Sequence, residues 1–214
     1  MAAPLLLVAA SGLAREVLAL LREQGEREVL GFLDDDPGLV GRDVDGLPVL
    51  GGIDDVARWP AAELVVCAGR GSARRSVVER LTRAGVTPER YATVVHPGVS
   101  TAGATRIGRG TILLAGVVLT TAVEIGDHVV VMPHVTLTHD DVVQDYATLC
   151  AGVALGGWVR VGPGAYLGMS SAVRERVSVG AGATLGMGSA LLEDLPAGQV
   201  WVGTPARPIT TRAR

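Results

Sequence analysis

The sequence predicts two structural units, a small α/β sheet followed by a long parallel β-helix. Short apolar runs alternate with helical patterns up to about residue 91, and a six-residue apolar repeat begins at Val95. The 214 residues include 29 glycines, while aromatic residues make up 3% of the chain, a composition that suits a narrow and regular core. We therefore expect one domain over residues 1–91 and a second over residues 92–214.

The first domain consists of apolar strands and amphipathic helices in alternation, and Gly25 and Gly85 are suitable helix ends. The expected elements are strands over 5–10, 28–33 and 63–69, and helices over 13–25 and 73–84. Such alternation is typical of βαβ units. We predict a small, parallel, Rossmann-like sheet that binds its ligands beyond the carboxyl ends of the strands.

The second domain is predicted from a repeat that never loses its register. Steps of six from Val95 to Leu191 reach positions that are all aliphatic except Thr101. A glycine follows the aliphatic residue at positions 108, 126, 156, 162, 168, 180 and 186. A six-residue period indicates a parallel β-helix in which the aliphatic side chains of successive coils stack. We expect glycine to turn its corners.

Composition excludes several classes of chemistry. All 19 basic residues are arginines, which excludes Schiff-base catalysis by lysine and a Walker A phosphate loop. A net charge of −3 argues against a nucleic-acid partner. The apolar runs are too short for a membrane span, and the opening residues lack the basic segment of a signal peptide. Because the chain has two cysteines, Cys67 and Cys150, a reducing cytoplasm is the expected location.

Three motifs, together with the repeat, resemble one protein family. AASGLAREVL (9–18), GFLDDD (31–36) and VGTPARPI (202–209) are similar to motifs of the sugar O- and N-acyltransferases that join a nucleotide-binding domain to a hexapeptide-repeat helix. That family includes sialic-acid O-acetyltransferases and N-acetyltransferases of nucleotide-linked 4-amino sugars such as bacillosamine and perosamine precursors. The resemblance implies a left-handed parallel β-helix, acetyl-CoA as the donor, a nucleotide-sugar acceptor, and a homotrimer with the active site between adjacent subunits.

His139 and Asp140 are the predicted catalytic pair. Acetyl transfer from a thioester needs a base to take the proton of the attacking amine or hydroxyl, and imidazole titrates near neutral pH. A neighbouring carboxylate can hold the histidine tautomer and stabilise the imidazolium. In the resembling enzymes a His-Glu or His-Asp pair stands at this position, which implies that His139 is the general base. Apart from the family, the pair could be a polar corner of one coil.

Asp141 occupies a repeat position that otherwise holds small side chains or valine. A carboxylate at such a position must be paired or hydrogen-bonded, because an isolated charge there loses its solvation. Asp141 therefore either supports His139 or marks a corner that bulges open at the site.

A metal site is not expected. His134 lies five residues before His139, and the trimeric γ-class carbonic anhydrases, which share this helix, bind zinc through three histidines. A coil contains about 18 residues, and no histidine stands one coil away from this pair, while His96 and His128 lie outside that register. Zinc needs three or four ligands, so we predict none.

The nucleotide sugar is expected in the first domain. Ser11 and Gly12 lie at a strand-to-helix turn, where backbone N–H groups and the helix dipole attract phosphate. Asp34 and Asp35 end the second strand, where a carboxylate can accept hydrogen bonds from a ribose or a base. The alternatives are a tight turn at Ser11 and a solvated turn at the aspartates.

Acetyl-CoA is expected in the second domain. A glycine wall that includes Gly157 leaves backbone groups accessible to the pantetheine amides, and Arg207 offers a guanidinium to phosphate. Thr148, assigned to the same site, stands where bacillosamine-type members carry a second histidine. Leu13 and Gln144 also depart from the family motifs, which have histidine and glycine there, so the identity of the sugar stays open.

The predicted function is acetyl-CoA-dependent N-acetylation of a nucleotide-linked amino sugar, with His139 as the base. Three alternatives remain at this stage. They are O-acetylation of sialic acid or another small hydroxyl acceptor, a γ-carbonic-anhydrase-like metalloenzyme, and a non-catalytic trimeric scaffold that binds a nucleotide sugar.

Overall fold

The computed structural model describes residues 3–209. The chain divides into two compact units, residues 1–94 and residues 95–214. In the described range, no helix is both long enough and apolar enough to cross a membrane.

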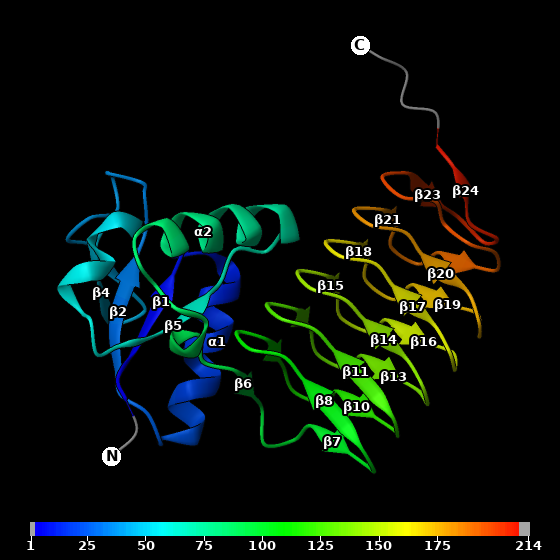
Figure 1. The fold of residues 1–214 in the computed structure, drawn as a ribbon, viewed down its shortest axis with the longest axis horizontal. Helices are drawn as coiled ribbons and strands as arrows, with labels where there is room; N and C mark the ends of the chain where they lie inside the picture. The colour runs from blue at the N-terminus through cyan, green and yellow to red at the C-terminus, as the bar shows by residue number, and fades with distance from the viewer. Residues whose placement is uncertain (1–2, 210–214) are drawn as a thin grey trace. The chain divides into compact units, whose positions relative to one another are not determined.

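The first unit is built on a five-stranded sheet in the order β3-β4-β2-β1-β5. Strand β1 (Leu5–Val8) lies between β2 (Val29–Leu33) and β5 (Glu63–Val66) and pairs in parallel with both. Helix α1 (Gly12–Gln24) follows β1, and helix α2 (Gly71–Arg83) follows β5 (Figure 1). The predicted parallel α/β fold is confirmed, and the carboxyl ends of the three strands lie at one edge of the sheet.

Helix α1 begins and ends near the predicted residues for identifiable reasons. The Ser11 hydroxyl accepts the N–H of Ala14 and caps the first turn. Gly25 ends the helix with a left-handed φ of 65°, and its N–H donates to the carbonyl of Leu21. Glycine adopts this conformation without the steric cost that a side chain would add. The apolar face of the helix is buried, as its periodicity predicts.

Four short elements were not foreseen from the sequence. They are β3 (Asp43–Val44), β4 (Leu47–Gly51) and two 3-10 helices, η1 (Ile53–Arg58) and η2 (Pro88–Arg90). Strand β4 pairs in parallel with β2, whereas β3 pairs antiparallel to β4, so the sheet is mixed at that edge. Gly31 permits the close approach of β2 to β4, because a Cβ there would lie 2.4 Å from the carbonyl oxygen of Pro48.

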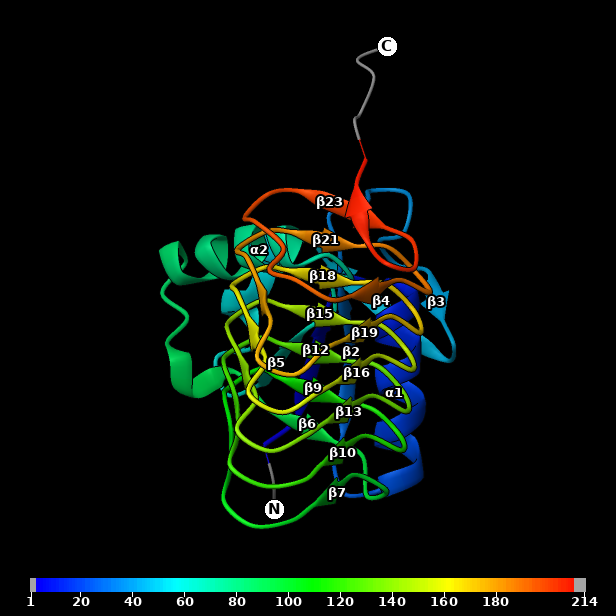
Figure 2. The ribbon, with the colours of Figure 1, turned by 90° about the vertical axis from the view of Figure 1, so that its right-hand side faces the viewer.

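The second unit is a left-handed parallel β-helix with three short strands in each coil, as predicted (Figure 2). The β7–β22 face contains β7 (Ser100–Thr101), β10 (Val118–Leu119), β13 (Thr136–Leu137), β16 (Ala154–Leu155), β19 (Ala172–Val173) and β22 (Ala190–Leu191). The β8–β20 face contains β8 (Thr105–Ile107), β11 (Val123–Ile125), β14 (Val142–Val143), β17 (Arg160–Val161) and β20 (Ser178–Val179). The β6–β24 face contains β6 (Val94–Val95), β9 (Ile112–Leu113), β12 (Val130–Val131), β15 (Thr148–Leu149), β18 (Tyr166–Leu167), β21 (Thr184–Leu185), β23 (Val200–Val202) and β24 (Arg207–Pro208).

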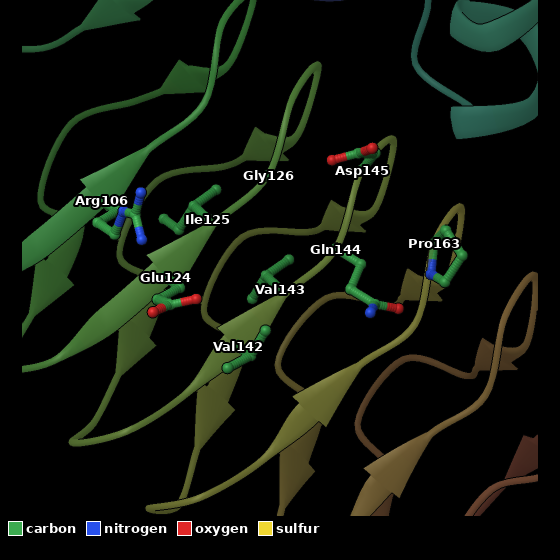
Figure 3. A pocket seen from close by; sticks show the side chains of 9 residues that line it. All are labelled: Arg106, Glu124, Ile125, Gly126, Val142, Val143, Gln144, Asp145 and Pro163. Atoms are coloured by element: carbon green, nitrogen blue, oxygen red, sulfur yellow. The ribbon is translucent and has the colours of Figure 1, made fainter.

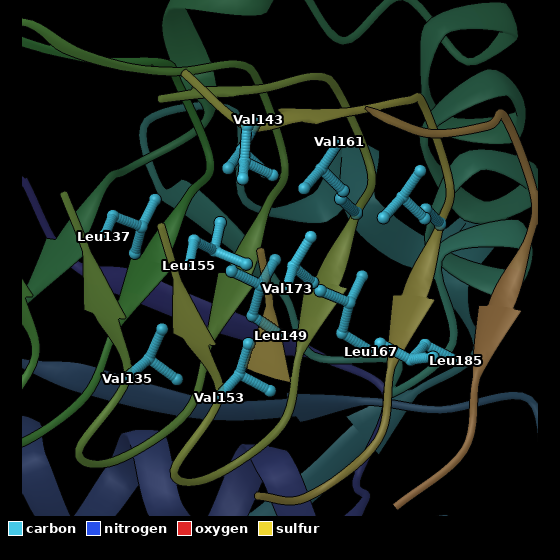
Figure 4. Close-up of a cluster of buried hydrophobic side chains, with 14 of the residues drawn as sticks. Val135, Leu137, Val143, Leu149, Val153, Leu155, Val161, Leu167, Val173 and Leu185 are labelled. Carbon is cyan, nitrogen blue, oxygen red and sulfur yellow. The ribbon is translucent and has the colours of Figure 1, made fainter. Parts of the chain in front are cut away.

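Strands of successive coils pair in parallel at a spacing of 18 residues, as in Val118 with Thr136. In most strands this register points an aliphatic residue into the prism, where it stacks on its counterparts in the coils before and after (Figure 4). Leu149, Leu167 and Leu185 form one such stack, and all three side chains are fully buried. A core one side chain deep on each face has little room for aromatic rings, which accounts for their scarcity.

Two different sets of glycine serve the corners. The residue three places after an aliphatic position adopts a left-handed backbone, and it is glycine at several corners, such as Gly116 and Gly152, but not at all of them. The glycines directly after the aliphatic positions serve close stacking instead: a Cβ on Gly162 would lie 2.7 Å from the backbone nitrogen of Ala181. The glycines that follow the aliphatic repeat are therefore spacers between coils.

The stacked core predicts a large cost for a truncation inside the prism. We expect Leu149→Ala to lower the free energy of unfolding by about 2–5 kcal/mol, because a fully buried leucine leaves a cavity that the neighbouring coils cannot close. Leu192, 45% exposed, is the control, and Leu192→Ala should change stability by less than about 0.5 kcal/mol. Urea unfolding measures both, and equal effects would contradict the stacking argument.

Candidate active site

The His139–Asp140 turn joins β13 to β14 at the corner between the β7–β22 and β8–β20 faces. His139 Nδ1 and Asp140 Oδ2 are 2.9 Å apart, and the His139 side chain is 54% exposed. Asp140 adopts a left-handed φ of 63°, a conformation that aspartate tolerates better than most residues. When the carboxylate accepts the Nδ1 proton, Nε2 is left with a lone pair, which is the form that a general base needs.

Gly157, one coil further along, forms the surface on which the His139 ring lies. A Cβ on Gly157 would lie 2.4 Å from Nε2 and 2.5 Å from Cε1 of that ring. Any side chain at position 157 would therefore displace the imidazole. Within the described residues the N–H of Gly157 donates no hydrogen bond to the protein, so it is available to a ligand.

Trp158 is a site feature that the sequence reasoning missed. Its ring lies edge-on to His139, with 6.3 Å between ring centroids, and the Arg176 guanidinium carbon lies 5.8 Å from the indole centroid. Trp158 is 46% exposed and has a φ of 66°, a left-handed conformation that is uncommon for a bulky residue. The available signal was a rare aromatic residue at the corner position of a repeat whose inward positions are aliphatic apart from Thr101.

Asp141 is fully buried beneath the same corner. Its Oδ2 accepts the N–H of Thr138 and its Oδ1 accepts the N–H of Val159, both at 2.8 Å. Burial raises the pKa of Asp141 to about 7, although the two backbone hydrogen bonds and His139 oppose the shift. The corner does not bulge open, because β13 and β14 keep the 18-residue register with their neighbours, although β13 pairs with β16 only through Thr136 and Ala154.

In the first unit, Ser11 and Gly12 lie at the carboxyl end of β1 as predicted. The Ser11 hydroxyl donates to the carbonyl of Cys67 at 2.6 Å, so it ties the β1–α1 turn to the end of β5. A Cβ on Gly12 would meet no atom within 4 Å, which shows open space above the helix N-terminus. The hydroxyl is used structurally, since it also accepts the N–H of Ala14 in the first turn of α1.

The carboxylates of Asp34 and Asp35 both accept hydrogen bonds from other residues of the protein. Asp34 Oδ2 accepts the N–H of Ala10 at 2.7 Å, which holds the β1–α1 turn against the end of β2. Asp35 accepts the N–H of Ile53 at 3.1 Å and forms an ion pair with Arg80 at 2.5 Å. Sequence reasoning could not foresee the second contact, because Arg80 is 45 residues away.

Thr148 and Arg207 do not adjoin the His139 turn in the sheet topology. Thr148 is a buried residue of β15 on the β6–β24 face, away from the corner that carries His139. Arg207, on β24, forms an ion pair with Glu193 at 2.6 Å, and both side chains are more than half exposed. An exposed ion pair of this kind is weak, so the guanidinium can exchange partners.

The β8–β20 face also carries an open pocket of about 400 Å³ (Figure 3). Its lining residues are Arg106, Glu124, Ile125, Gly126, Val142, Val143, Gln144, Asp145 and Pro163. None of the residues predicted to be catalytic or to bind a ligand is among them.

Metal ligands do not assemble in the described range: no three His, Cys, Asp or Glu side chains of residues 3–209 lie close enough to hold an ion. His128 lies instead against Tyr146, with 5.3 Å between the centroids of two nearly parallel rings.

Comparisons with known proteins agree with this architecture. Residues 4–81 match the family described as the PglD N-terminal domain, and residues 104–139 match the bacterial transferase hexapeptide family, six repeats. A search of curated protein sequences found no match.

Solved structures match almost the whole chain. The acetyltransferase domain of PglB from Neisseria gonorrhoeae, in complex with acetyl coenzyme A, has a TM-score of 0.89 at 26% identity, covering 98% of this chain and 100% of that one. PerB from Caulobacter crescentus, in complex with CoA and GDP-perosamine, has a TM-score of 0.88 at 26% identity, with 98% and 99% covered. WeeI from Acinetobacter baumannii has a TM-score of 0.87 at 28% identity, with 96% and 99% covered.

Fold, motifs and comparisons thus define an acyltransferase with a left-handed β-helix. The chain combines a PglD-type N-terminal domain with a hexapeptide-repeat helix, the arrangement of the sugar acyltransferases that it resembles.

The contact between Gly157 and His139 predicts a loss of activity without a loss of fold. Gly157→Ala should lower kcat for acetyl transfer by at least about 10-fold, because the new methyl group displaces the His139 ring, the predicted base. The neighbouring Gly156→Ala is the matched variant: its Cβ would lie 2.6 Å from the backbone nitrogen of Glu175, so stability should fall instead. Steady-state kinetics and thermal unfolding separate the two effects, and wild-type kcat in Gly157→Ala would refute this role.

The buried carboxyl of Asp141 predicts a pH-dependent stability. Its pKa rises from 3.8 to about 7 on folding, so the folded state binds the proton more tightly. The associated stability is present below pH 4 and is lost as pH rises to 7, by at most about 4 kcal/mol. Urea unfolding of wild type and Asp141→Val at pH 4, 5.5 and 7.5 should show that the free energy of unfolding of the wild type falls relative to that of the variant as pH rises. Parallel pH profiles would contradict the prediction.

Proposed function

We propose that this protein transfers an acetyl group from acetyl-CoA to the amine of a nucleotide-linked sugar. The observation that carries the proposal is the His139–Asp140 pair at a corner of the hexapeptide helix. Its Nδ1 and Oδ2 atoms are 2.9 Å apart, and the imidazole lies against Gly157. Structures that match nearly the whole chain contain acetyl coenzyme A, or CoA with GDP-perosamine. Two structures of the perosamine N-acetyltransferase have one histidine replaced, by asparagine or by alanine.

The geometry supports base catalysis by His139. The sugar amine attacks the thioester carbonyl, and Nε2 takes the proton that the nitrogen loses, while Asp140 stabilises the imidazolium through Nδ1. The N–H of Gly157, which has no acceptor within the described residues, is assigned to the oxyanion that forms on the carbonyl oxygen. Collapse of this intermediate breaks the carbon–sulfur bond, and the imidazolium returns its proton to the departing thiolate of CoA.

The acceptor nucleotide is assigned to the first unit. The N-terminus of α1, with open space above Gly12, suits a diphosphate because its N–H groups and dipole attract negative charge. Asp34 contributes by holding the β1–α1 turn in place. Asp35 is assigned to the ribose or base as well, and it would have to share its carboxylate with Arg80.

The donor is assigned to the β-helix. Gly157 offers its backbone to the thioester end of acetyl-CoA, and Arg207 can exchange Glu193 for a CoA phosphate because their ion pair is exposed. Thr148 is assigned to the donor through the family alone, since it lies on a different face of the prism from His139.

A homotrimer completes the proposal. His139 is more than half exposed in a single chain, and water beside the base weakens electrostatic catalysis, so a neighbouring subunit is the natural second wall. We place the enzyme in the cytoplasm, which agrees with two buried cysteines, Cys67 and Cys150, that form no disulfide in the described residues.

The proposal predicts that His139→Ala abolishes transfer. We expect kcat to fall by at least about 100-fold with nucleotide-linked 4-amino sugars, because general-base catalysis contributes about 10²–10⁴-fold. Thiol release from acetyl-CoA measures the rate, and mass spectrometry identifies the acetylated sugar. His134→Ala, at an exposed corner of the same coil, is the control and should keep wild-type turnover. Near-wild-type turnover in His139→Ala would remove the histidine from the mechanism.

A further inference from the structure

The hydrogen-bond ladder between coils changes at the His139 turn. At equivalent positions, a backbone N–H donates to a carbonyl of the next coil: Thr120 to Leu137, Gly156 to Val173, and Arg174 to Leu191. Thr138 occupies the same position, but its N–H donates to Oδ2 of Asp141. The Thr138 hydroxyl donates instead to the carbonyl of Leu155 at 3.1 Å. Asp141 has therefore replaced a backbone contact immediately before His139.

The second oxygen of Asp141 reaches the neighbouring coil. Oδ1 accepts the N–H of Val159, which directly follows Gly157 and Trp158. One carboxylate thus holds the turn that carries the base and the turn on which the base lies. In the coils immediately before and after, this position is occupied by Val123 and Val159, which have no acceptor in their side chains.

A carboxylate is a costly residue for this position. Asp141 is the one carboxylic acid among the buried side chains of residues 3–209, and burying a charge is unfavourable even when it is hydrogen-bonded. Valine would fill the prism and would leave the N–H of Thr138 free to donate to Leu155, as the ladder does elsewhere. The position therefore carries a residue that stability alone would not select.

We propose that Asp141 is a positioning residue for acetyl transfer, which sets the His139 turn relative to Gly157 on the next coil. The inference rests on the proposed function, in which His139 is the base. Asp141 touches neither substrate; it acts by fixing backbone N–H groups on both sides of the reacting corner. This kind of local departure from the most stable packing is found where geometry serves function.

The test is Asp141→Val, with Asp141→Asn as the conservative variant and Thr111→Val as the matched control. Thr111 occupies the same repeat position at another corner, and its hydroxyl likewise accepts an N–H one coil on, that of Val129. At pH 7.5 we expect Asp141→Val to have a higher urea midpoint than wild type, together with a kcat lower by about 10–100-fold and a KM for acetyl-CoA within about twofold. Asp141→Asn, which keeps one acceptor, should retain more activity than Asp141→Val, and Thr111→Val should keep wild-type kcat.

Two results would overturn the inference: wild-type kcat in Asp141→Val, or an equal loss of kcat in Thr111→Val. A crystal structure of Asp141→Val provides a readout independent of activity, in which Thr138 N–H should donate to Leu155 and the His139 ring should leave Gly157. If the wild type acetylates no nucleotide amino sugar, the proposed function fails. The crystal structure then still decides the positioning role, and an unmoved His139 would refute it.

Discussion

The stacking of one aliphatic side chain on another, coil after coil, is the constraint on which the second unit depends. Each coil must return to the same inward position after 18 residues, as Leu149 and Leu167 do, or the buried column would be broken. That requirement sets where the corners fall and which residues lie above one another. His139, Gly157 and the Glu175–Arg176 turn are stacked for this reason. The packing of the core thus sets the geometry of the corner that carries His139.

Corners lie outside the packed column, so they can carry chemistry at little cost to the core. Asp140 and Trp158 turn the chain with left-handed backbones where other corners use glycine. Asp141 differs because it faces inward. Its carboxylate stands where an aliphatic side chain would pack, and it accepts two backbone hydrogen bonds. The corner that carries His139 is therefore a place where the regular repeat is broken, since Thr138 N–H donates to Asp141 and not to a carbonyl of the next coil.

Regular patterns made the fold predictable, and irregular ones did not. Strands β1, β2 and β5 lie in short apolar runs of the sequence. The six-residue period predicted the β-helix, whereas its handedness needed the family resemblance. Strand β3 has two residues and β4 contains Pro48, so neither has a periodicity to detect. The contact of Asp35 with Arg80 is likewise invisible to local patterns, because it joins residues far apart in the chain.

By itself, the sequence determined the two-part fold, the excluded lysine chemistry and the His139–Asp140 pair, since these depend on residue type and on spacing along one chain. Only the tertiary structure decided what adjoins that pair. It placed Gly157 beneath the imidazole, brought Trp158 beside it, and gave Asp141 contacts that neither of the two initial interpretations had described. Such relations arise between coils, where side chains 18 residues apart meet, and the stacked core sets their distances.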